Sequence, residues 1–89
     1  MRTDFRKSSA RNLRKRKNDS DFLDCVKKAI EDVELAETTS RITNLKKLKG
    51  KGGYYRIRLG NYRIGIKIED DLVVFIRALH RKDIYRYFP

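Results

Sequence analysis

Cysteine, proline and tryptophan are nearly absent from this chain: its 89 residues include one cysteine, one proline and no tryptophan. A lone Cys25 can form neither an internal disulfide nor a cysteine-based zinc site, which excludes a disulfide-stapled secreted protein and favours a reducing compartment. No apolar run approaches the roughly 18 residues that a membrane span requires, and the basic N-terminus is not followed by the apolar core of a signal peptide. We therefore predict a cytoplasmic protein without a membrane segment.

Linkers and repeats are missing as well. The single proline is Pro89, and no internal repeat or low-complexity tract divides the sequence. A chain of this length fits one small domain. We expect a single domain over residues 1–89.

Acidic residues are absent from one long stretch. The chain has 23 Lys and Arg against 12 Asp and Glu, a net charge of +11, and residues 41–63 contain eight of the cations and no acid. A solvated surface normally mixes both signs. The stretch therefore predicts an anion-binding surface, and a polyphosphate such as RNA is the expected ligand.

The N-terminal half reads as helical. Residues 7–16 suit a helix that covers little core, and residues 1–5 suit either a brief edge strand or the lead into that helix. Asp19 and its neighbours offer N-cap chemistry before a second helix, in which Cys25 is a small core residue. Residues 42–48 suit a short helical turn. The second helix is predicted from one apolar stripe at helical spacing: Phe22, Val26, Ala29, Ile30 and Val33.

The C-terminal half reads as three strands, over residues 54–59, 62–69 and 72–79. The two-residue Gly60-Asn61 connection predicts a hairpin, and a loop of that length fixes the pairing of its strands. One face of the hairpin is then apolar and the other basic. The predicted fold is α+β, with two N-terminal helices packed on one face of a small antiparallel β-meander. The register places Arg58 opposite Arg63, Ile57 opposite Ile64, and Arg56 opposite Gly65.

The basic face of this hairpin is a candidate anion site. Like charges directly opposite each other, such as Arg58 and Arg63, destabilise a sheet. Arg56 lies on the same face, and Gly65 opposite it leaves a small gap. Guanidinium groups bind phosphate through a planar fork of donors. We therefore predict an anion held over the gap by the three arginines.

The segment after the third strand carries the only histidine, His80, followed by Arg81 and Tyr85. Because it leaves the third strand, this segment can return these groups to the face that carries the arginines. An imidazole, a phenol and an arginine cluster suit general acid–base chemistry at a phosphodiester. The apolar residues of 84–88 also suggest a docking element for a partner protein.

Three motifs together resemble a known family. They are Leu45-Lys46-Lys47-Leu48-Lys49-Gly50, then Tyr55-Arg56-Ile57-Arg58-Leu59-Gly60-Asn61-Tyr62-Arg63-Ile64, then His80-Arg81-Lys82-Asp83-Ile84-Tyr85-Arg86. In this order the chain resembles the RelE branch of the RelE/ParE toxin superfamily. The resemblance implies a small α+β toxin that cleaves mRNA in the ribosomal A site with no metal or cofactor. It also implies an antitoxin encoded beside the toxin, and the basic surface predicts that this antitoxin is acidic.

The resemblance assigns roles to individual residues. The catalytic set falls on Arg56, Arg58, Arg63, His80, Arg81 and Tyr85. Some members have lysine where this chain has Arg56 and Arg58, and arginine cannot act as a base because it is effectively always charged. Those two arginines are therefore predicted to act electrostatically, while proton transfer falls to His80 and Tyr85 in an order left open. The residues predicted to hold ribosomal RNA are Lys46, Lys47, Lys49 and Lys51.

Two other functions remain open from the sequence. One is a ParE-like inhibitor of DNA gyrase on the same scaffold. The other is a small basic RNA-binding protein without catalytic activity.

Overall fold

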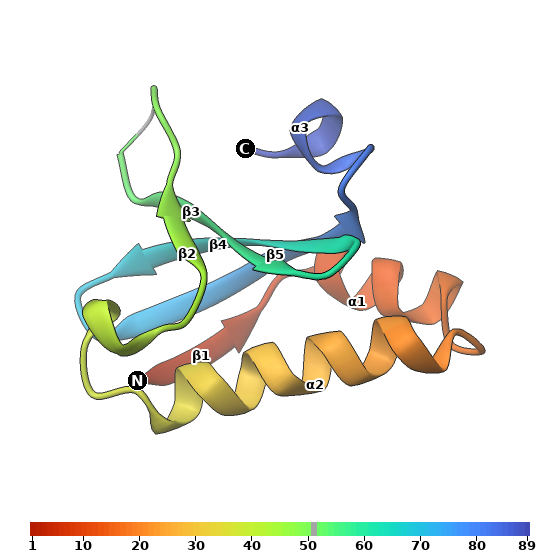
Figure 1. Ribbon diagram of the computed structural model, residues 1–89. Helices are drawn as coiled ribbons and strands as arrows, with labels where there is room; N and C mark the ends of the chain where they lie inside the picture. Colours follow the sequence, from red (N-terminus) through yellow and green to blue (C-terminus); the bar gives the residue numbers. More distant parts are fainter. Residues whose placement is uncertain (51) are drawn as a thin grey trace.

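A five-stranded sheet in the order β1-β5-β4-β3-β2 forms the centre of the fold (Figure 1). The structure is a computed structural model that describes residues 1–50 and 52–89, so the prediction for Lys51 lies outside the described residues. Within these residues no helix is long and apolar enough to cross a membrane. The elements are β1 (Arg2–Phe5), α1 (Lys7–Lys15), α2 (Ser20–Leu35), η1 (Thr39–Arg41), β2 (Leu45–Lys47), β3 (Tyr54–Leu59), β4 (Tyr62–Glu69), β5 (Leu72–His80) and α3 (Ile84–Tyr87).

Strands β3, β4 and β5 form the predicted antiparallel meander. The β3–β4 hairpin has the register expected from its two-residue loop, with Arg58 opposite Arg63 and Ile57 opposite Ile64. Side chains alternate along a strand, so the leucine and isoleucines of this hairpin point to one face. We call it the inner face and the opposite one the outer face. The apolar alternation is confirmed, because Ile57 and Ile64 are each only 1% exposed.

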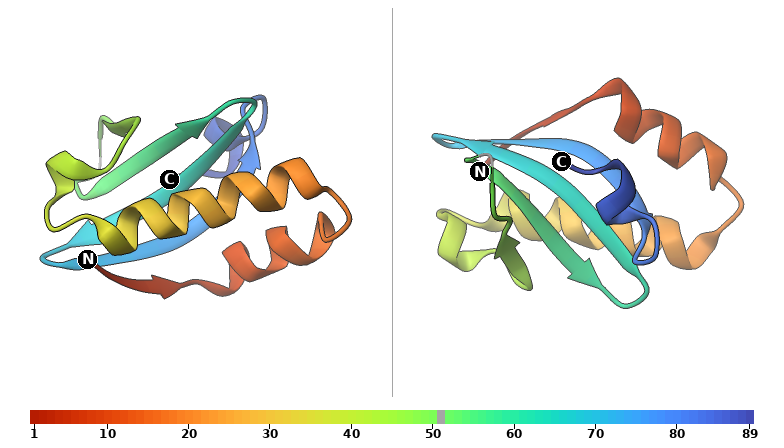
Figure 2. Two further views of the ribbon diagram at one scale, coloured as in Figure 1. Left: turned by 60° about the horizontal axis from the view of Figure 1, so that its bottom comes forward. Right: turned by 90° about the horizontal axis from the view of Figure 1, so that it is seen from above.

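Helix α2 covers the inner face. Asp19 is its N-cap, as predicted, and the Asp19 carboxylate accepts a hydrogen bond from the Phe22 backbone N–H at 3.1 Å. The helix runs below the sheet in Figure 1 and crosses its strands obliquely in Figure 2. The predicted apolar stripe forms the helical side of the core, and four of its members are buried: Phe22, Val26, Ala29 and Val33.

Helix α1 lies at the edge of the sheet and not beneath it (Figure 2). Strand β1 runs parallel to the first half of β5, and α1 then continues along the second half. The Ser8 hydroxyl donates to the Ile76 carbonyl at 2.6 Å, and the Ala78 N–H donates to Asn12 Oδ1 at 3.2 Å. Polar side chains of α1 therefore satisfy backbone groups that an edge strand leaves unpaired. The predicted α+β arrangement of two N-terminal helices packed with the sheet is confirmed, with α2 on the inner face and α1 along the β5 edge.

The N-terminal strand and β2 complete a mixed sheet. The strand alternative for residues 1–5 is confirmed by β1, which pairs in parallel with β5. The helical turn expected within residues 42–48 is wrong, because Leu45–Lys47 form strand β2 beside β3. The apolar residues of this segment fall at every third position, which suited a helix. Pairing with the free edge of β3 outweighs that weak local preference.

A β-bulge near Ile76 interrupts β5. Phe75 lies opposite Ile66, whereas Arg77 lies opposite Gly65, so Ile76 is an extra residue on its strand. An extra residue reverses the alternation of every side chain that follows it. Beyond the bulge, Arg77 and Leu79 therefore point to the outer face.

Candidate active site

Helix α3 is fixed on the outer face by two apolar side chains. Ile84 is fully buried and Phe88 is 2% exposed, so both pack inside the protein. A Cβ atom built at Gly65 would lie 2.7 Å from carbons of the Phe88 ring, which shows that this ring fills the space above the glycine. The predicted gap over Gly65 is therefore wrong, whereas the binding of an anion by the three arginines stays a prediction. Residues 84–88 were expected to dock a partner protein. Ile84 and Phe88, at the two ends of this segment, instead pack inside the protein itself.

The Arg58–Arg63 pair lies beside this anchored helix, on the outer face. The Arg63 guanidinium donates from Nη1 to the Gly60 carbonyl at 2.7 Å and to the Tyr62 carbonyl at 2.9 Å. The hairpin loop thus holds Arg63 in place. Burial, and then the Arg56 and Arg58 cations, lower the pKa of Arg63, which still remains protonated at neutral pH. These like charges concentrate positive potential at one place on the sheet.

Arg56 connects this cluster to α3. Its Nε donates to the Tyr85 hydroxyl at 3.4 Å, and its Nη1 donates to the Asn44 carbonyl at 3.2 Å. The same carbonyl accepts the Arg58 backbone N–H at 3.2 Å. Asn44 has a positive φ of 62°, a conformation that asparagine tolerates better than most residues. Tyr85 is 61% exposed, so its phenol stands at the surface next to a guanidinium.

Arg81 completes the group. Its backbone N–H donates to the Asn61 carbonyl at 2.8 Å, which ties the turn before α3 to the hairpin loop. Its cation lies close enough to Arg63 to contribute to the lowered pKa of that residue. We call the five residues brought together here the arginine cluster: Arg56, Arg58, Arg63, Arg81 and Tyr85.

His80 does not join the arginine cluster. It lies opposite Tyr62 at the end of β5, and the two rings meet edge to face with centroids 6.0 Å apart. Tyr62 belongs to the inner face, so His80 also points to that face. Its Nδ1 accepts the Lys82 backbone N–H at 3.2 Å. The structure therefore separates the predicted histidine from the predicted arginines.

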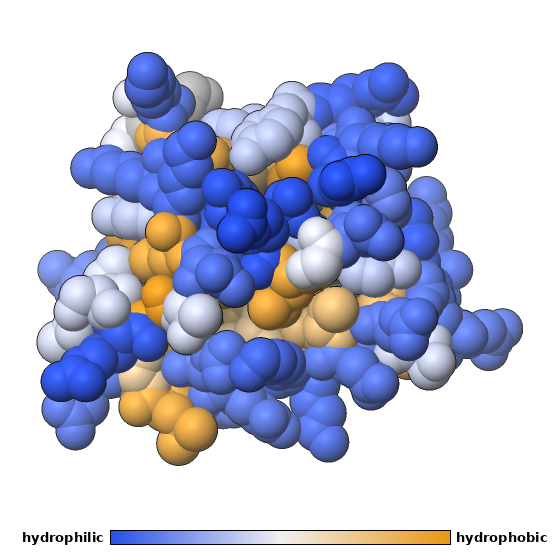
Figure 3. Space-filling view, viewed as in Figure 1, coloured by the Kyte–Doolittle hydropathy of each residue, from blue (hydrophilic) through white to orange (hydrophobic). Residues whose placement is uncertain are grey.

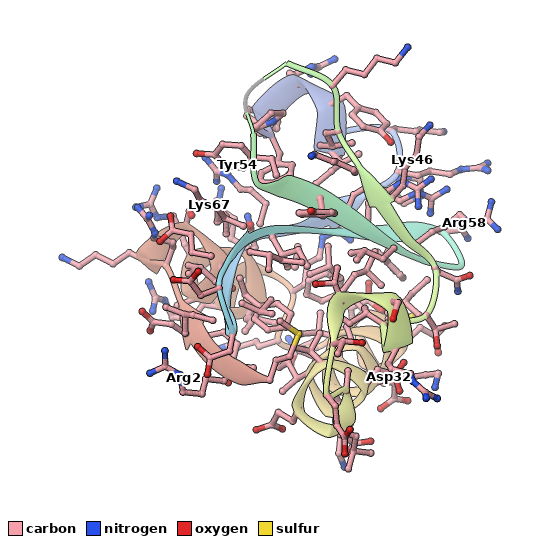
Figure 4. All side chains as sticks on the ribbon, turned by 90° about the vertical axis from the view of Figure 1, so that its left-hand side faces the viewer. Arg2, Asp32, Lys46, Tyr54, Arg58 and Lys67 are labelled. Atoms are coloured by element: carbon pink, nitrogen blue, oxygen red, sulfur yellow. The ribbon has the colours of Figure 1, made fainter. Side chains whose placement is uncertain are left out.

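The predicted lysines extend the positive surface along β2 and the loop after it. Lys46 lies opposite Arg56, on the outer face, while Lys47 lies opposite Tyr55, on the inner side. Lys46, Lys47 and Lys49 are all exposed. Figure 4 shows Lys46 and Arg58 extending on the same side of the molecule, above Asp32 of α2. In Figure 3 the most hydrophilic residues gather above the sheet, between β2 and α3.

Other chemistry-bearing groups have ordinary structural roles. Cys25 is half-buried, and burial followed by nearby Asp21 and Asp24 raises the pKa of its thiol, which opposes thiolate formation. Among residues 1–50 and 52–89, no three His, Cys, Asp or Glu side chains gather as metal ligands would.

Sequence reasoning missed two outer-face residues, Arg77 and Tyr87. The Arg77 guanidinium carbon lies 5.9 Å from the centroid of the Tyr87 ring. Alternation counted along an uninterrupted third strand places Arg77 on the inner side, because the bulge leaves no signal in the sequence. Tyr87 is 52% exposed, and its position among the apolar residues of 84–88 gave no sign of this exposure.

Comparison with known proteins gives a consistent family. A model described as the ParE toxin of the type II toxin-antitoxin system, parDE, matches residues 4–85. Toxin RelE3 of Methanocaldococcus jannaschii is 61% identical over 46 residues. That match spans about half of each protein, 52% of this chain and 52% of the relative.

Solved structures agree over almost the whole chain. The RelB-RelE antitoxin-toxin complex from Methanococcus jannaschii matches with a TM-score of 0.78 and 38% identity, covering 97% of this chain and 99% of the matched one. The YoeB dimer from Staphylococcus aureus matches with a TM-score of 0.73, covering 91% of this chain and 97% of that one. At 15% identity, the second match shows a shared fold only.

Proposed function

The chain belongs to the RelE/ParE toxin superfamily of type II toxin–antitoxin systems, and from this premise we propose that it is an endoribonuclease that cleaves mRNA in the ribosomal A site. The observation that carries the proposal is the arginine cluster. Four guanidinium groups and one exposed phenol meet on the outer face, although like charges placed so close together cost stability. An arrangement with that cost is expected where an anion must be bound.

The proposed reaction is attack of a ribose 2′-oxygen on the adjacent phosphorus. The 2′-hydroxyl loses its proton to a water molecule, and the 2′-oxygen bonds to phosphorus as the bond from phosphorus to the 5′-oxygen of the next nucleotide breaks. That 5′-oxygen gains a proton from the Tyr85 phenol, which water then restores. A 2′,3′-cyclic phosphate remains, and its hydrolysis by one water molecule gives a 3′-phosphate. Negative charge builds up on the phosphorane, and preorganised cations at that position lower the barrier.

Within this proposal each cluster residue has a distinct task. Arg63, held by two carbonyls of the hairpin loop, binds the phosphate in a fixed direction. Arg58 and Arg81 add positive charge around it. Arg56 orients the hydroxyl of Tyr85, and that phenol is the proton donor for the leaving 5′-oxygen.

His80 is assigned no part in the proposed mechanism, because it faces Tyr62 on the inner side. Of the two proton transfers that the sequence divided between His80 and Tyr85, donation to the leaving 5′-oxygen therefore falls to Tyr85, and the 2′-hydroxyl proton passes to water. The reaction as proposed requires no metal or cofactor, since guanidinium groups supply the positive charge.

The proposed partners follow from the surface. The exposed Lys46, Lys47 and Lys49 bind the phosphate backbone of ribosomal RNA in the cytoplasm, a role also proposed for Lys51. An acidic antitoxin neutralises the toxin, and the complexes of RelE with RelB among the structural relatives support such a partner. Opposite charges would speed their encounter.

A ParE-like inhibitor of DNA gyrase is the second candidate, and the match to a family model named for ParE is the observation that favours it. A protein that inhibits gyrase by binding alone does not need a tyrosine hydroxyl oriented by an arginine, as Tyr85 is by Arg56. The two candidates differ in target and in chemistry, so one pair of assays separates them.

The purified protein is added to translating ribosomes and the 5′ ends of the mRNA are mapped, in parallel with a gyrase supercoiling assay. We expect cuts within the A-site codon and normal supercoiling. Tyr85→Phe should lower the cleavage rate by about 10²-fold because it lacks the transferable proton, whereas His80→Ala should retain cleavage. Intact mRNA with blocked supercoiling would support the ParE-like function, and intact mRNA with normal supercoiling would leave only an RNA-binding protein.

A further inference from the structure

A second cationic and aromatic surface lies on the far side of α3 from Tyr85. It is a groove of about 240 Å³ between α1, β5 and α3. We call it the Tyr87 groove. None of the six residues that line it is acidic: Asn12, Lys15, Arg16, Arg77, Leu79 and Tyr87.

The β-bulge builds this groove. It turns Arg77 and Leu79 to the outer face, where Leu79 lies opposite Arg63 on the neighbouring strand. The floor of the Tyr87 groove is therefore next to the residue that is proposed to hold the scissile phosphate. The groove is an extension of the outer-face surface and not a remote pocket.

Helix α3 places one tyrosine on each of its sides. Ile84 and Phe88 are four residues apart and both face the sheet. Tyr85 and Tyr87 are two residues apart, which is about 200° around a helix, so they project in nearly opposite directions. Each ring has a guanidinium beside it: Arg56 lies 3.4 Å from the Tyr85 hydroxyl, and Arg77 lies 5.9 Å from the Tyr87 ring centroid.

The chemistry of the groove suits one nucleotide of a single strand. An exposed aromatic ring beside cations stacks a base while the cations hold its phosphate, and every base has a face that can stack. Tyr87 is 52% exposed, and Lys15 is an exposed cation at the end of α1. The volume suits one flat base better than a folded ligand.

We propose that the Tyr87 groove binds a nucleotide of the RNA substrate strand next to the cleaved one, with its base stacked on Tyr87 and its phosphate held by Arg77 and Lys15. The proposal rests on the proposed function, because it takes the arginine cluster as the cleavage site. Tyr87 lies outside residues 4–85, which match the family model, so the family assignment gives this residue no role.

The absence of tryptophan provides a direct test. Tyr87→Trp introduces a single fluorescent indole into the groove, and the probe is a 2′-O-methylated single-stranded RNA hexanucleotide, which cannot be cleaved by 2′-oxygen attack. We expect the indole fluorescence to be quenched as the RNA stacks on it. The matched control is Phe5→Trp, on β1 away from the groove, which should not be quenched. If the indole of the Tyr87→Trp variant stays unquenched at RNA concentrations that saturate the protein, the proposal is overturned.

The same hexanucleotide, now carrying a fluorescent label, is then used to measure by fluorescence anisotropy how much each groove residue contributes to binding. Arg77→Gln and Tyr87→Leu should each weaken binding about fivefold or more, while Tyr87→Phe should stay within about twofold of wild type. Lys27→Gln removes the same charge from the exposed surface of α2 and controls for net charge. Equal losses for Arg77→Gln and Lys27→Gln, or no binding by the wild-type chain at low salt, would overturn the proposal.

A ribosomal assay separates this proposal from the proposed function. If the wild type cleaves mRNA and Tyr87→Leu changes neither the rate nor the preferred flanking base, the groove proposal fails while the proposed function stands. If Tyr87→Leu lowers ribosomal cleavage but binds the hexanucleotide as tightly as wild type, the groove contacts ribosomal RNA and its assignment to the substrate strand is wrong. If the wild type cleaves nothing, the proposed function fails, and the fluorescence result alone decides the groove.

Discussion

The two faces of the β3–β4 hairpin are made by the same two strands but follow opposite rules. On the inner face, Ile57 lies opposite Ile64, and both are buried under α2. On the outer face one residue further along, Arg58 lies opposite Arg63, a pairing of like charges. Apolar pairs of the first kind stabilise a sheet, whereas pairs of the second kind destabilise it.

This difference shows how a small chain keeps a costly site. Because alternation separates the two sets of side chains completely, charges can be added to the outer face without disturbing the core. The inner face then supplies the stability that offsets the repulsion on the outer face. Substitutions on the two faces should accordingly have different consequences, and four experiments test this.

The largest effect is expected from Ile64→Asp. An unpaired carboxylate in a position that is 1% exposed should cost an amount comparable to the whole stability of the chain, roughly 5–13 kcal/mol for this size. We expect a largely unfolded protein by circular dichroism. The matched control is Arg58→Asp, which places the same residue on the outer face, opposite Arg63, and should remain folded. A folded Ile64→Asp variant would mean that the two faces are not distinct.

The next largest effect is expected from Arg63→Ala, and it should fall on activity alone. Removal of the best-held phosphate ligand should lower the rate of mRNA cleavage by about 10²–10³-fold. The two carbonyls that it leaves are near the surface and can bind water, and repulsion with Arg58 is relieved, so the free energy of unfolding should change by less than about 1 kcal/mol. Cleavage is measured alongside thermal unfolding. A large drop in the unfolding temperature would assign Arg63 a structural task instead.

Much of this contrast could be predicted from the sequence because it depends on local rules. The two-residue loop at Gly60-Asn61 sets the hairpin register, and register with alternation then determines both faces. The stripe that begins at Phe22 and the cap at Asp19 predict α2 in the same local way. Those elements, and the encounter of Arg56, Arg58 and Arg63, agree with the structure.

The errors all involve residues that are distant in sequence. Phe88 covers Gly65 from 23 positions away, so nothing near the glycine shows that its space is filled. Strand β2 forms because β3 offers a free edge, against the spacing of its own apolar residues. The bulge in β5 appears only in pairing with β4, yet it decides that His80 points inward and Arg77 outward. Contacts of this kind are set by tertiary packing, which local patterns do not encode.

Gly65→Ala should have a smaller effect that reaches both stability and activity. The new methyl group would lie 2.7 Å from the Phe88 ring, so the ring must move, and overpacking of this kind typically costs about 1–3 kcal/mol. Because Phe88 anchors α3, Tyr85 should move as well and cleavage should decline. The double variant Gly65→Ala/Phe88→Leu, with a smaller side chain above the methyl group, should recover part of both losses. If the single variant unfolds at the wild-type temperature, Phe88 does not fill this space.

The smallest effect is expected from Asp19→Asn, at a place where the inner face meets the outer-face site. The Tyr62 hydroxyl donates to Asp19 Oδ2 at 3.0 Å, and the backbone carbonyl of Tyr62 in turn accepts from Arg63. The hydrogen bond from the Phe22 backbone N–H, and then that from Tyr62, lower the pKa of the Asp19 carboxyl below its ordinary 3.8. A lowered folded-state pKa stabilises the protein fully above pH 3.8, and this contribution is lost as the pH falls through the folded-state pKa. Asparagine is an equally good N-cap but carries no charge.

The wild type should therefore unfold at a temperature a few degrees above that of Asp19→Asn at pH 6, and this difference should narrow at pH 3. Tyr62→Phe, which removes the second donor, should reduce the same pH dependence, and cleavage by both variants should stay within a few-fold of wild type. An equal difference in unfolding temperature at both pH values would show that the charge of the Asp19 carboxylate, and so its hydrogen bonds to Phe22 and Tyr62, does not stabilise the protein.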